Sequence, residues 1–271
     1  MSAKPRLPAV AWLLLIVATA VYVAWGLFPD SAFYRDARTR HVLLATAALL
    51  KIGSLLVGAL LAFACRDRLE EGNPARPAWV LLATGLFMTL AGQLGLAPHQ
   101  LVSGETPFPS VADLFYVLSY PFLISAFLVF LRAHQESGFS TSSLTERFVI
   151  VTTIAVVGGA AAVHMLRPVA SGGGEVLDRM LNVAYPVLDL VLLMPLALLV
   201  RMAMRMRGSH VGGVWALLLA GFVCLSIGDI SFAYFSTLGE QHLDPYVHAT
   251  FLLSYGLITG GAYKQLQLLK S

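Results

Sequence analysis

The sequence predicts an all-α polytopic membrane protein with about eight transmembrane helices. Hydrophobic residues make up 58% of the 271 residues and charged residues only 12%, and the mean hydropathy is +0.76. Apolar runs of roughly 20 residues, the length that crosses a bilayer as a helix, recur along the whole chain. No stretch has the composition of a soluble domain, so we expect residues 1–271 to form a single integral membrane domain.

The apolar runs place the helices in order along the chain. We expect them at about residues 9–28, 41–65, 78–97, 110–132, 147–166, 178–204, 211–236 and 245–268. The first run is long and lacks a small-residue cleavage site, so it is expected to stay as a signal anchor. Pro121 and Pro186 lie inside the fourth and sixth runs, where a proline commonly kinks a helix.

The distribution of basic residues predicts an orientation. If the N-terminus is inside, the inner segments hold most of them: Lys4, Arg6, Arg66, Arg68, Arg76, Arg132, Arg147, Arg201, Arg205, Arg207, Lys264 and Lys270. The outer loops hold only Arg35, Arg38, Arg40, Arg167 and Arg179. By the positive-inside rule both termini are cytoplasmic. The net charge of +3 comes from arginines in short loops, so we expect no nucleic-acid partner.

The two halves of the chain resemble each other. Ser119–Ile124 (SYPFLI) aligns with Ser254–Thr259 (SYGLIT) at a shift of 135 residues. The same shift lays each of the first four runs on one of the last four, which predicts two parallel four-helix repeats, at 9–132 and 147–268. The alternative explanation for this similarity is chance, because hydrophobic helices resemble one another in composition.

Acidic residues interrupt three of the most hydrophobic segments, at Asp113, Asp189 and Asp229. A carboxylate in hydrocarbon is costly unless it is paired, hydrated or neutralised, so such residues usually face a bundle interior or a water-filled cavity. Lys51 lies at a similar depth in the second run. We therefore expect Lys51 to form an ion pair with Asp189 or Asp229.

The polar residues fall in the predicted outer half of the membrane. Spacing of i, i+3, i+7 puts Asp113, Tyr116 and Tyr120 on one helix face, and Asn182, Tyr185 and Asp189 on one face of another. We predict one outward-opening cavity with these ligand-binding residues: Lys51, Gln93, Asp113, Tyr116, Tyr120, Tyr185, Asp189, Asp229 and His248. No metal-ligand cluster or nucleophile motif is visible, so no catalytic residue, metal or cofactor is assigned.

A structural role for these residues is the alternative. Intramembrane polar side chains can hold helices together at about 1 kcal/mol per contact. Asp113 follows Pro109 and Ser110 closely enough to be an N-terminal helix cap. A structural network predicts a dry, closed helix interface and variants that fail to fold.

Three motifs resemble those of a known family, the multi-helix membrane input domain at the N-terminus of some bacterial GGDEF/EAL diguanylate cyclases and histidine kinases. Its PS-x-AD-x-x-Y-x-x-x-YP segment is matched by Pro109, Ser110, Ala112, Asp113, Tyr116, Tyr120 and Pro121. Later YP-x-x-D-x-x-LL and GD segments are matched by Tyr185, Pro186, Asp189, Leu192 and Leu193, and by Gly228, Asp229, Tyr234 and Asp244. The similarity covers roughly residues 78 to 262, and it departs at Gln93, where the pattern has an aspartate.

The resemblance implies a sensory module of the bacterial inner membrane. Such a module binds a small molecule or ion from outside and signals inward through its last helix. No PAS, cyclase or kinase module is present in the sequence, so the resemblance implies a cytoplasmic signalling partner or a C-terminal effector in a longer chain. Two other functions stay open: an intramembrane enzyme that uses paired aspartates on a lipid, and a proton-coupled small-molecule transporter.

Overall fold

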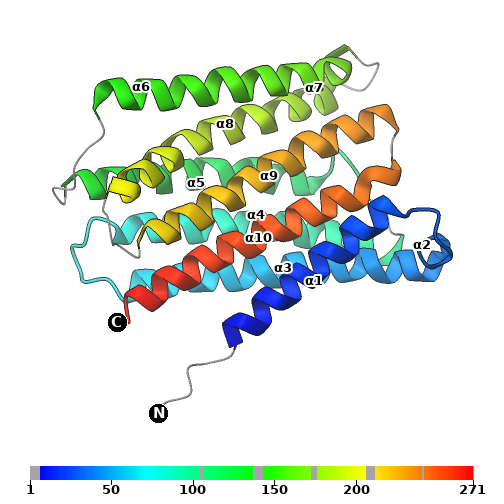
Figure 1. Cartoon of the computed structure of the whole chain (residues 1–271), viewed down its shortest axis with the longest axis horizontal. Helices are drawn as coiled ribbons and strands as arrows, with labels where there is room; N and C mark the ends of the chain where they lie inside the picture. Colours follow the sequence, from blue (N-terminus) through cyan, green and yellow to red (C-terminus); the bar gives the residue numbers. More distant parts are fainter. Residues whose placement is uncertain are drawn as a thin grey trace.

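The computed structural model describes residues 7–103, 106–136, 143–171, 176–205, 211–239 and 241–270, and these residues form helices and short connections without a strand (Figure 1). The long helices are α1 (Leu7–Leu27), α3 (Ala37–Asp67), α4 (Arg76–Val102), α5 (Val111–Glu136), α8 (Val176–Arg205), α9 (Gly212–Leu238) and α10 (Asp244–Leu268). A π-helical turn, Ile154–Gly158, joins α6 (Leu144–Thr153) to α7 (Gly159–Ser171). The short elements are α2 (Ala32–Arg35) and the turn Gln241–Leu243.

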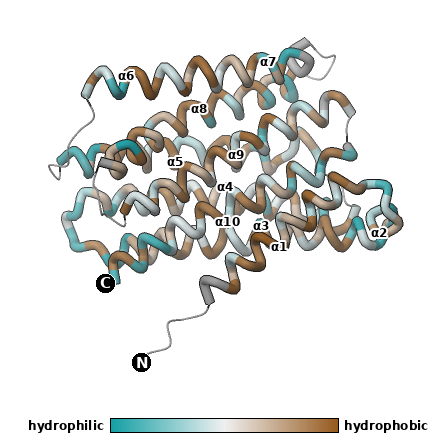
Figure 2. The backbone as a smooth tube through the Cα atoms, viewed as in Figure 1, coloured by the Kyte–Doolittle hydropathy of each residue, from teal (hydrophilic) through white to brown (hydrophobic). Residues whose placement is uncertain are grey.

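Seven of the predicted spans are helices long and apolar enough to cross a membrane: α1, α3, α4, α5, α6 with α7, α8 and α9. This confirms an all-α polytopic fold. Hydrophilic residues gather at the helix ends and in the loops, as Figure 2 shows. The eighth predicted span, α10, has 25 residues but falls short of the hydropathy that the other seven reach. It packs against α1, α3 and α9, so much of its surface is covered by protein, and a covered helix needs fewer apolar residues.

Six helices form a closed ring of contacts. Within the described residues, α3 contacts α4, α4 contacts α5, α5 contacts α8, α8 contacts α9, α9 contacts α10, and α10 returns to α3. Outside this ring α1 lies against α10, and α7 lies against α8 and α9. We call the end of the bundle where α1 begins and α10 ends the termini end, and the opposite end the far end (Figure 1).

The contact pattern has the symmetry that a duplication predicts. Exchanging α3, α4 and α5 for α8, α9 and α10 maps every contact of the ring onto another one. One pair of close approaches agrees: a Cβ at Gly85 of α4 would meet Leu123 of α5, and a Cβ at Gly221 of α9 would meet Ile258 of α10, which is Leu123 shifted by 135 residues. The outer helices α1 and α7 do not follow this pattern, and the repeat itself stays a prediction.

Apolar side chains fill the ring toward the termini end. The core includes Leu82, Phe127, Phe130, Leu199, Trp215 and Phe222, each at most 2% exposed. Helices α5 and α8 run on through Pro121 and Pro186. Lys4, Arg6 and Arg207, which contribute to the predicted orientation, lie outside the described residues. The orientation therefore also stays a prediction.

Candidate functional site

The centre of the candidate site is the hydroxyl group of Tyr120. It lies 2.8 Å from Oδ1 of Asp189 and 3.3 Å from Oδ2 of Asp229, so α5, α8 and α9 meet at one oxygen atom. A phenol carries a single hydrogen and can donate it to only one carboxylate. The other carboxylate needs a proton of its own or a donor from elsewhere.

Asp189 has an unmet hydrogen-bonding capacity. Its side chain is only 2% exposed. Its Oδ2 makes no hydrogen bond of normal geometry with the described residues, although the side chains of Ser226 and Asp229 are close to the carboxyl group. Buried polar atoms are nearly always hydrogen-bonded, because leaving one unpaired costs about 1–3 kcal/mol. The unpaired oxygen therefore indicates a place for a proton or a ligand.

Asp113 joins α5 to α8. Its Oδ1 accepts a 2.7 Å hydrogen bond from the Tyr185 hydroxyl, and its Oδ2 accepts one of 2.7 Å from the backbone N–H of Ser110. Asp113 is thus not itself the N-cap of α5. It is the third residue of the helix, and it bonds back to Ser110 as in a capping box. The ring centroids of Tyr185 and Tyr120 are 6.4 Å apart, which connects Asp113 to the centre of the site.

A chain of amide groups continues toward the far end. The Tyr116 hydroxyl donates to Oε1 of Gln93 at 3.4 Å, and Nε2 of Gln93 donates to Oε1 of Gln100 at 3.1 Å. Gln100 in turn donates to Thr106 at 3.2 Å. The sequence analysis did not include Gln100, although its spacing of seven residues from Gln93 on a helix was a usable signal.

We call these predicted residues the far-end cluster: Gln93, Asp113, Tyr116, Tyr120, Tyr185, Asp189 and Asp229. Three of them, Tyr116, Tyr185 and Asp229, are half-buried, and the other four are buried. The i, i+3, i+7 spacing did place Asp113, Tyr116 and Tyr120 together. The cluster lies in the half of the ring nearer the far end, where α5 and α10 begin.

The predicted ion pair of Lys51 with Asp189 or Asp229 is wrong. No ion pair among the described residues includes Lys51. Its Nζ lies 3.5 Å from Nδ1 of His248 and 6.0 Å from the centroid of the Phe251 ring. The reason is the order of the ring: α3 has α4 and α10 as neighbours, whereas the two aspartates are on α8 and α9. Lys51 and His248 therefore form a second buried polar pair.

The predicted single outward cavity stays a prediction. The far-end cluster is held by direct hydrogen bonds. The two described pockets lie at the termini end, and neither is lined by any of the three aspartates. Among the described residues there is also no group of three or more His, Cys, Asp or Glu side chains that could hold a metal ion.

The far-end cluster is thus a carboxylate- and tyrosine-rich hydrogen-bond network with one unpaired acceptor. It can bind a proton or a ligand that donates hydrogen bonds. Comparisons with protein-family models, with curated proteins and with solved structures found no match to this chain.

Proposed function

We propose that the protein is a sensory, ligand-binding module of the bacterial inner membrane, which takes a small molecule or ion at the far-end cluster. One observation carries the proposal. Asp189 and Asp229 share the hydroxyl of Tyr120 while Oδ2 of Asp189 has no partner among the described residues. Inside a bilayer an unpaired carboxylate oxygen is costly, and a bound donor removes that cost.

The hydrogen-bond balance of the far-end cluster favours a cationic ligand with N–H donors. The carboxyl groups of Asp113, Asp189 and Asp229 are hydrogen-bond acceptors. Among the described residues, none of the three forms an ion pair with a Lys or Arg side chain. The tyrosines offer ring faces as well as hydroxyl groups, and aromatic faces attract cations. A small primary amine combines the charge and the donors that such a site lacks.

We propose that helix α10 transmits the structural change caused by ligand binding to the cytoplasmic side. It contacts α9, which carries Asp229, and also α3 and α1. Near its end, Leu266 is buried in the core and Leu269 packs against that core, so a shift of the core would move the end of α10 and reach a cytoplasmic signalling partner or a following effector. With both termini cytoplasmic, as the Lys and Arg distribution predicts, alkaline phosphatase fused to the C-terminus is expected to be inactive.

The test uses the full chain in lipid nanodiscs with methylammonium as the probe. Tetramethylammonium, which has the charge but no N–H group, is the comparison. We expect methylammonium to raise the unfolding temperature of the wild type more than tetramethylammonium does. Asp189→Asn and Tyr120→Phe are expected to lose this effect while keeping the wild-type circular dichroism spectrum, and Tyr263→Phe is the matched control that keeps it.

Two results would contradict the proposal. The first is a wild type that methylammonium does not stabilise. The second is a pair of variants, Asp189→Asn and Tyr120→Phe, that fail to fold, because that outcome assigns the cluster a structural role.

The convergence of two aspartates also favours a second candidate function, an intramembrane hydrolase acting on a lipid. Such a mechanism needs one carboxyl group as acid and one as base near a water molecule, and Asp189 and Asp229 contact the same hydroxyl. Release of fatty acid from vesicles by the wild type, but not by Asp229→Asn, would support it. Unchanged vesicle lipids would exclude it.

A further inference from the structure

A groove lies between α6 and α8 at the termini end of the bundle. Its volume is about 250 Å³, and it is lined by Thr145, Glu146, Val149 and Ile150 of α6 and by Arg201 of α8. None of these residues belongs to the hydrogen bonds of the far-end cluster. The groove is therefore a separate feature of the fold.

This groove is open on the outer side of the ring of helices. Helix α6 packs on α8 from outside the ring (Figure 1), and its span, Leu144–Arg167, is the least buried of the seven. Val149 is 55% exposed, and the side chains of Arg201 and Glu146 are 41% and 29% exposed. A molecule of the surrounding membrane can therefore reach the groove without any movement of the core.

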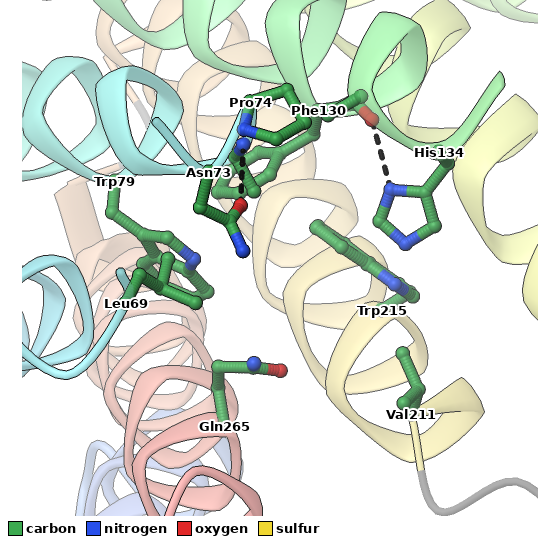
Figure 3. A pocket seen from close by; sticks show the side chains of 11 residues that line it. Leu69, Asn73, Pro74, Trp79, Phe130, His134, Val211, Trp215 and Gln265 are labelled. Carbon is green, nitrogen blue, oxygen red and sulfur yellow. Dashed lines mark hydrogen bonds between the residues drawn. The ribbon is translucent and has the colours of Figure 1, made fainter. Parts of the chain in front are cut away.

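The other cavity at the termini end offers no comparable access to its aromatic walls. It has a volume of about 210 Å³ and lies among the ends of α4, α5, α9 and α10 (Figure 3). There Phe130 packs on both Trp79 and Trp215, and all three are at most 2% exposed. We therefore assign these side chains to the core.

The lining of the groove changes from polar to apolar with depth. Glu146 is in the first turn of α6, and Arg201 is close to the end of α8 at Arg205. Val149 and Ile150 lie about one turn further along α6, toward the middle of the bundle. A phospholipid has the same order, because its headgroup lies at the membrane surface and its acyl chains lie in the hydrocarbon core.

The two charged residues form an ion pair that can make further hydrogen bonds. Nη2 of Arg201 donates to Oε1 of Glu146 at 2.9 Å, and a guanidinium has several more N–H donors. Oε2 of Glu146 accepts from the backbone N–H of Ser143 in a capping box, and a carboxylate can accept up to about four hydrogen bonds. The groove thus presents a cation and an anion side by side, and the two charges cancel.

We propose that this groove binds a phospholipid whose headgroup carries both a phosphate and a primary ammonium, as phosphatidylethanolamine does. The phosphate accepts hydrogen bonds from the guanidinium of Arg201, and the ammonium donates to the carboxylate of Glu146. An acyl chain continues along Val149 and Ile150. The Glu146 carboxylate disfavours a headgroup with a net negative charge. This site is independent of the function proposed for the far-end cluster.

Native mass spectrometry of the full chain in detergent measures the binding of individual lipids. The probes are phosphatidylethanolamine, phosphatidylcholine and phosphatidylglycerol with the same acyl chains. The ammonium of phosphatidylcholine has no N–H group, so we expect phosphatidylethanolamine to bind about threefold more tightly. Phosphatidylglycerol, which has a net negative charge and no ammonium, is also expected to bind more weakly than phosphatidylethanolamine.

Three variants test the contacts. Arg201→Gln removes the cation, and we expect about tenfold weaker binding of phosphatidylethanolamine. Glu146→Gln keeps the capping box, which accepts Gln as well as Glu, and is expected to abolish the preference over phosphatidylcholine. Arg66→Gln at the end of α3 is the matched control, because Arg66 is also 41% exposed in an ion pair, with Asp67, and does not line the groove. It is expected to bind as the wild type does.

Three results would overturn the inference. The first is equal binding of the three lipids by the wild type, and the second is tighter binding of phosphatidylglycerol than of phosphatidylethanolamine. The third is an Arg201→Gln variant that binds phosphatidylethanolamine as tightly as Arg66→Gln does. Should Arg201→Gln fail to fold, Val149→Trp decides, because it fills the groove from an exposed position: weaker binding supports the site, and unchanged binding contradicts it.

Discussion

The ammonium group of Lys51 on α3 faces the imidazole of His248 on α10, with 3.5 Å between Nζ and Nδ1. Lys51 is 3% exposed and His248 9% exposed. An ammonium has only hydrogens to offer, so Nδ1 must accept, which places the imidazole hydrogen on Nε2. His248 is the counterpart of Asp113 at the 135-residue shift. Asp113 joins α5 to the adjacent helix α8, and His248 joins α10 to the adjacent helix α3.

This pair predicts an asymmetric response to mutation. His248→Leu leaves a buried ammonium without its acceptor, which is expected to lower the free energy of unfolding by about 1–3 kcal/mol. Lys51→Met removes the charge itself and is expected to cost less. In the double variant part of the loss should return, as a double-mutant cycle in detergent would measure. Additive effects of the two substitutions would show that the residues are not coupled.

The hydrogen bonds of Tyr185 and Tyr116 differ in strength. Tyr185 donates to a carboxylate at 2.7 Å, and Tyr116 donates to an amide oxygen at 3.4 Å. Tyr185→Phe is therefore expected to destabilise by about 1.5–3 kcal/mol, and Tyr116→Phe by clearly less. Chemical denaturation of both variants in the same detergent measures the difference. An equal loss of unfolding free energy in both variants would mean that the hydrogen bond to Asp113 is no stronger than the one to Gln93.

Helices α9 and α10 pack through Gly221. A Cβ there would lie 3.0 Å from the carbonyl oxygen and 3.1 Å from the nitrogen of two α10 residues, Ser254 and Ile258. Backbone atoms cannot turn aside, so we expect Gly221→Ala to destabilise by about 1–3 kcal/mol. Gly53→Ala on α3, where nothing lies within 4 Å, is the control and is expected to be neutral or slightly stabilising. Thermal unfolding of the two variants side by side tests this, and similar midpoints would contradict the close approach.

The N-terminus of α3 is expected to respond to pH. The backbone N–H of Thr39 and then its hydroxyl donate to the Asp36 carboxylate, and these bonds lower its pKa below 3.8. A lowered pKa in the folded state stabilises the helix start fully above 3.8, and the contribution is lost as the pH falls through the lowered pKa. The protection factor for amide exchange at Thr39 and Arg40, which corrects for the intrinsic effect of pH, is expected to fall in that acid range. Asp36→Asn would make this protection factor independent of pH in that range, and an unchanged profile in that variant would refute the assignment.

Much of the fold follows from patterns that act within one helix. Apolar length placed the spans, and the spacing of Asp113, Tyr116 and Tyr120 placed them on one face. Tyr120, Asp189 and Asp229 lie at a similar depth in the predicted membrane, and for this reason the sequence could place them in one cluster. Depth, however, does not determine which helices are neighbours around a ring, so the partner of Lys51 was assigned wrongly.

The remaining differences have similar physical causes. Helix α4 continues to Val102, beyond the predicted end at residue 97, so Gln100 seemed to belong to a loop. Whether a cavity opens at the far-end cluster is set by how tightly side chains fill the space between the helices, and packing of that kind depends on the whole bundle.

The closed ring has a consequence for biosynthesis. Helix α10 follows the other ring helices in the chain, yet it is the element that joins α9 back to α3. Before α10 is inserted, Lys51 lacks its His248 partner, and the gap between α3 and α9 is open to lipid. Because α10 falls short of the hydropathy of the other spans, its insertion is expected to depend on contacts with α3 and α9, which are made earlier. Closure of the ring is therefore expected only after translation of α10, although α5 and α8 already join the two halves before it.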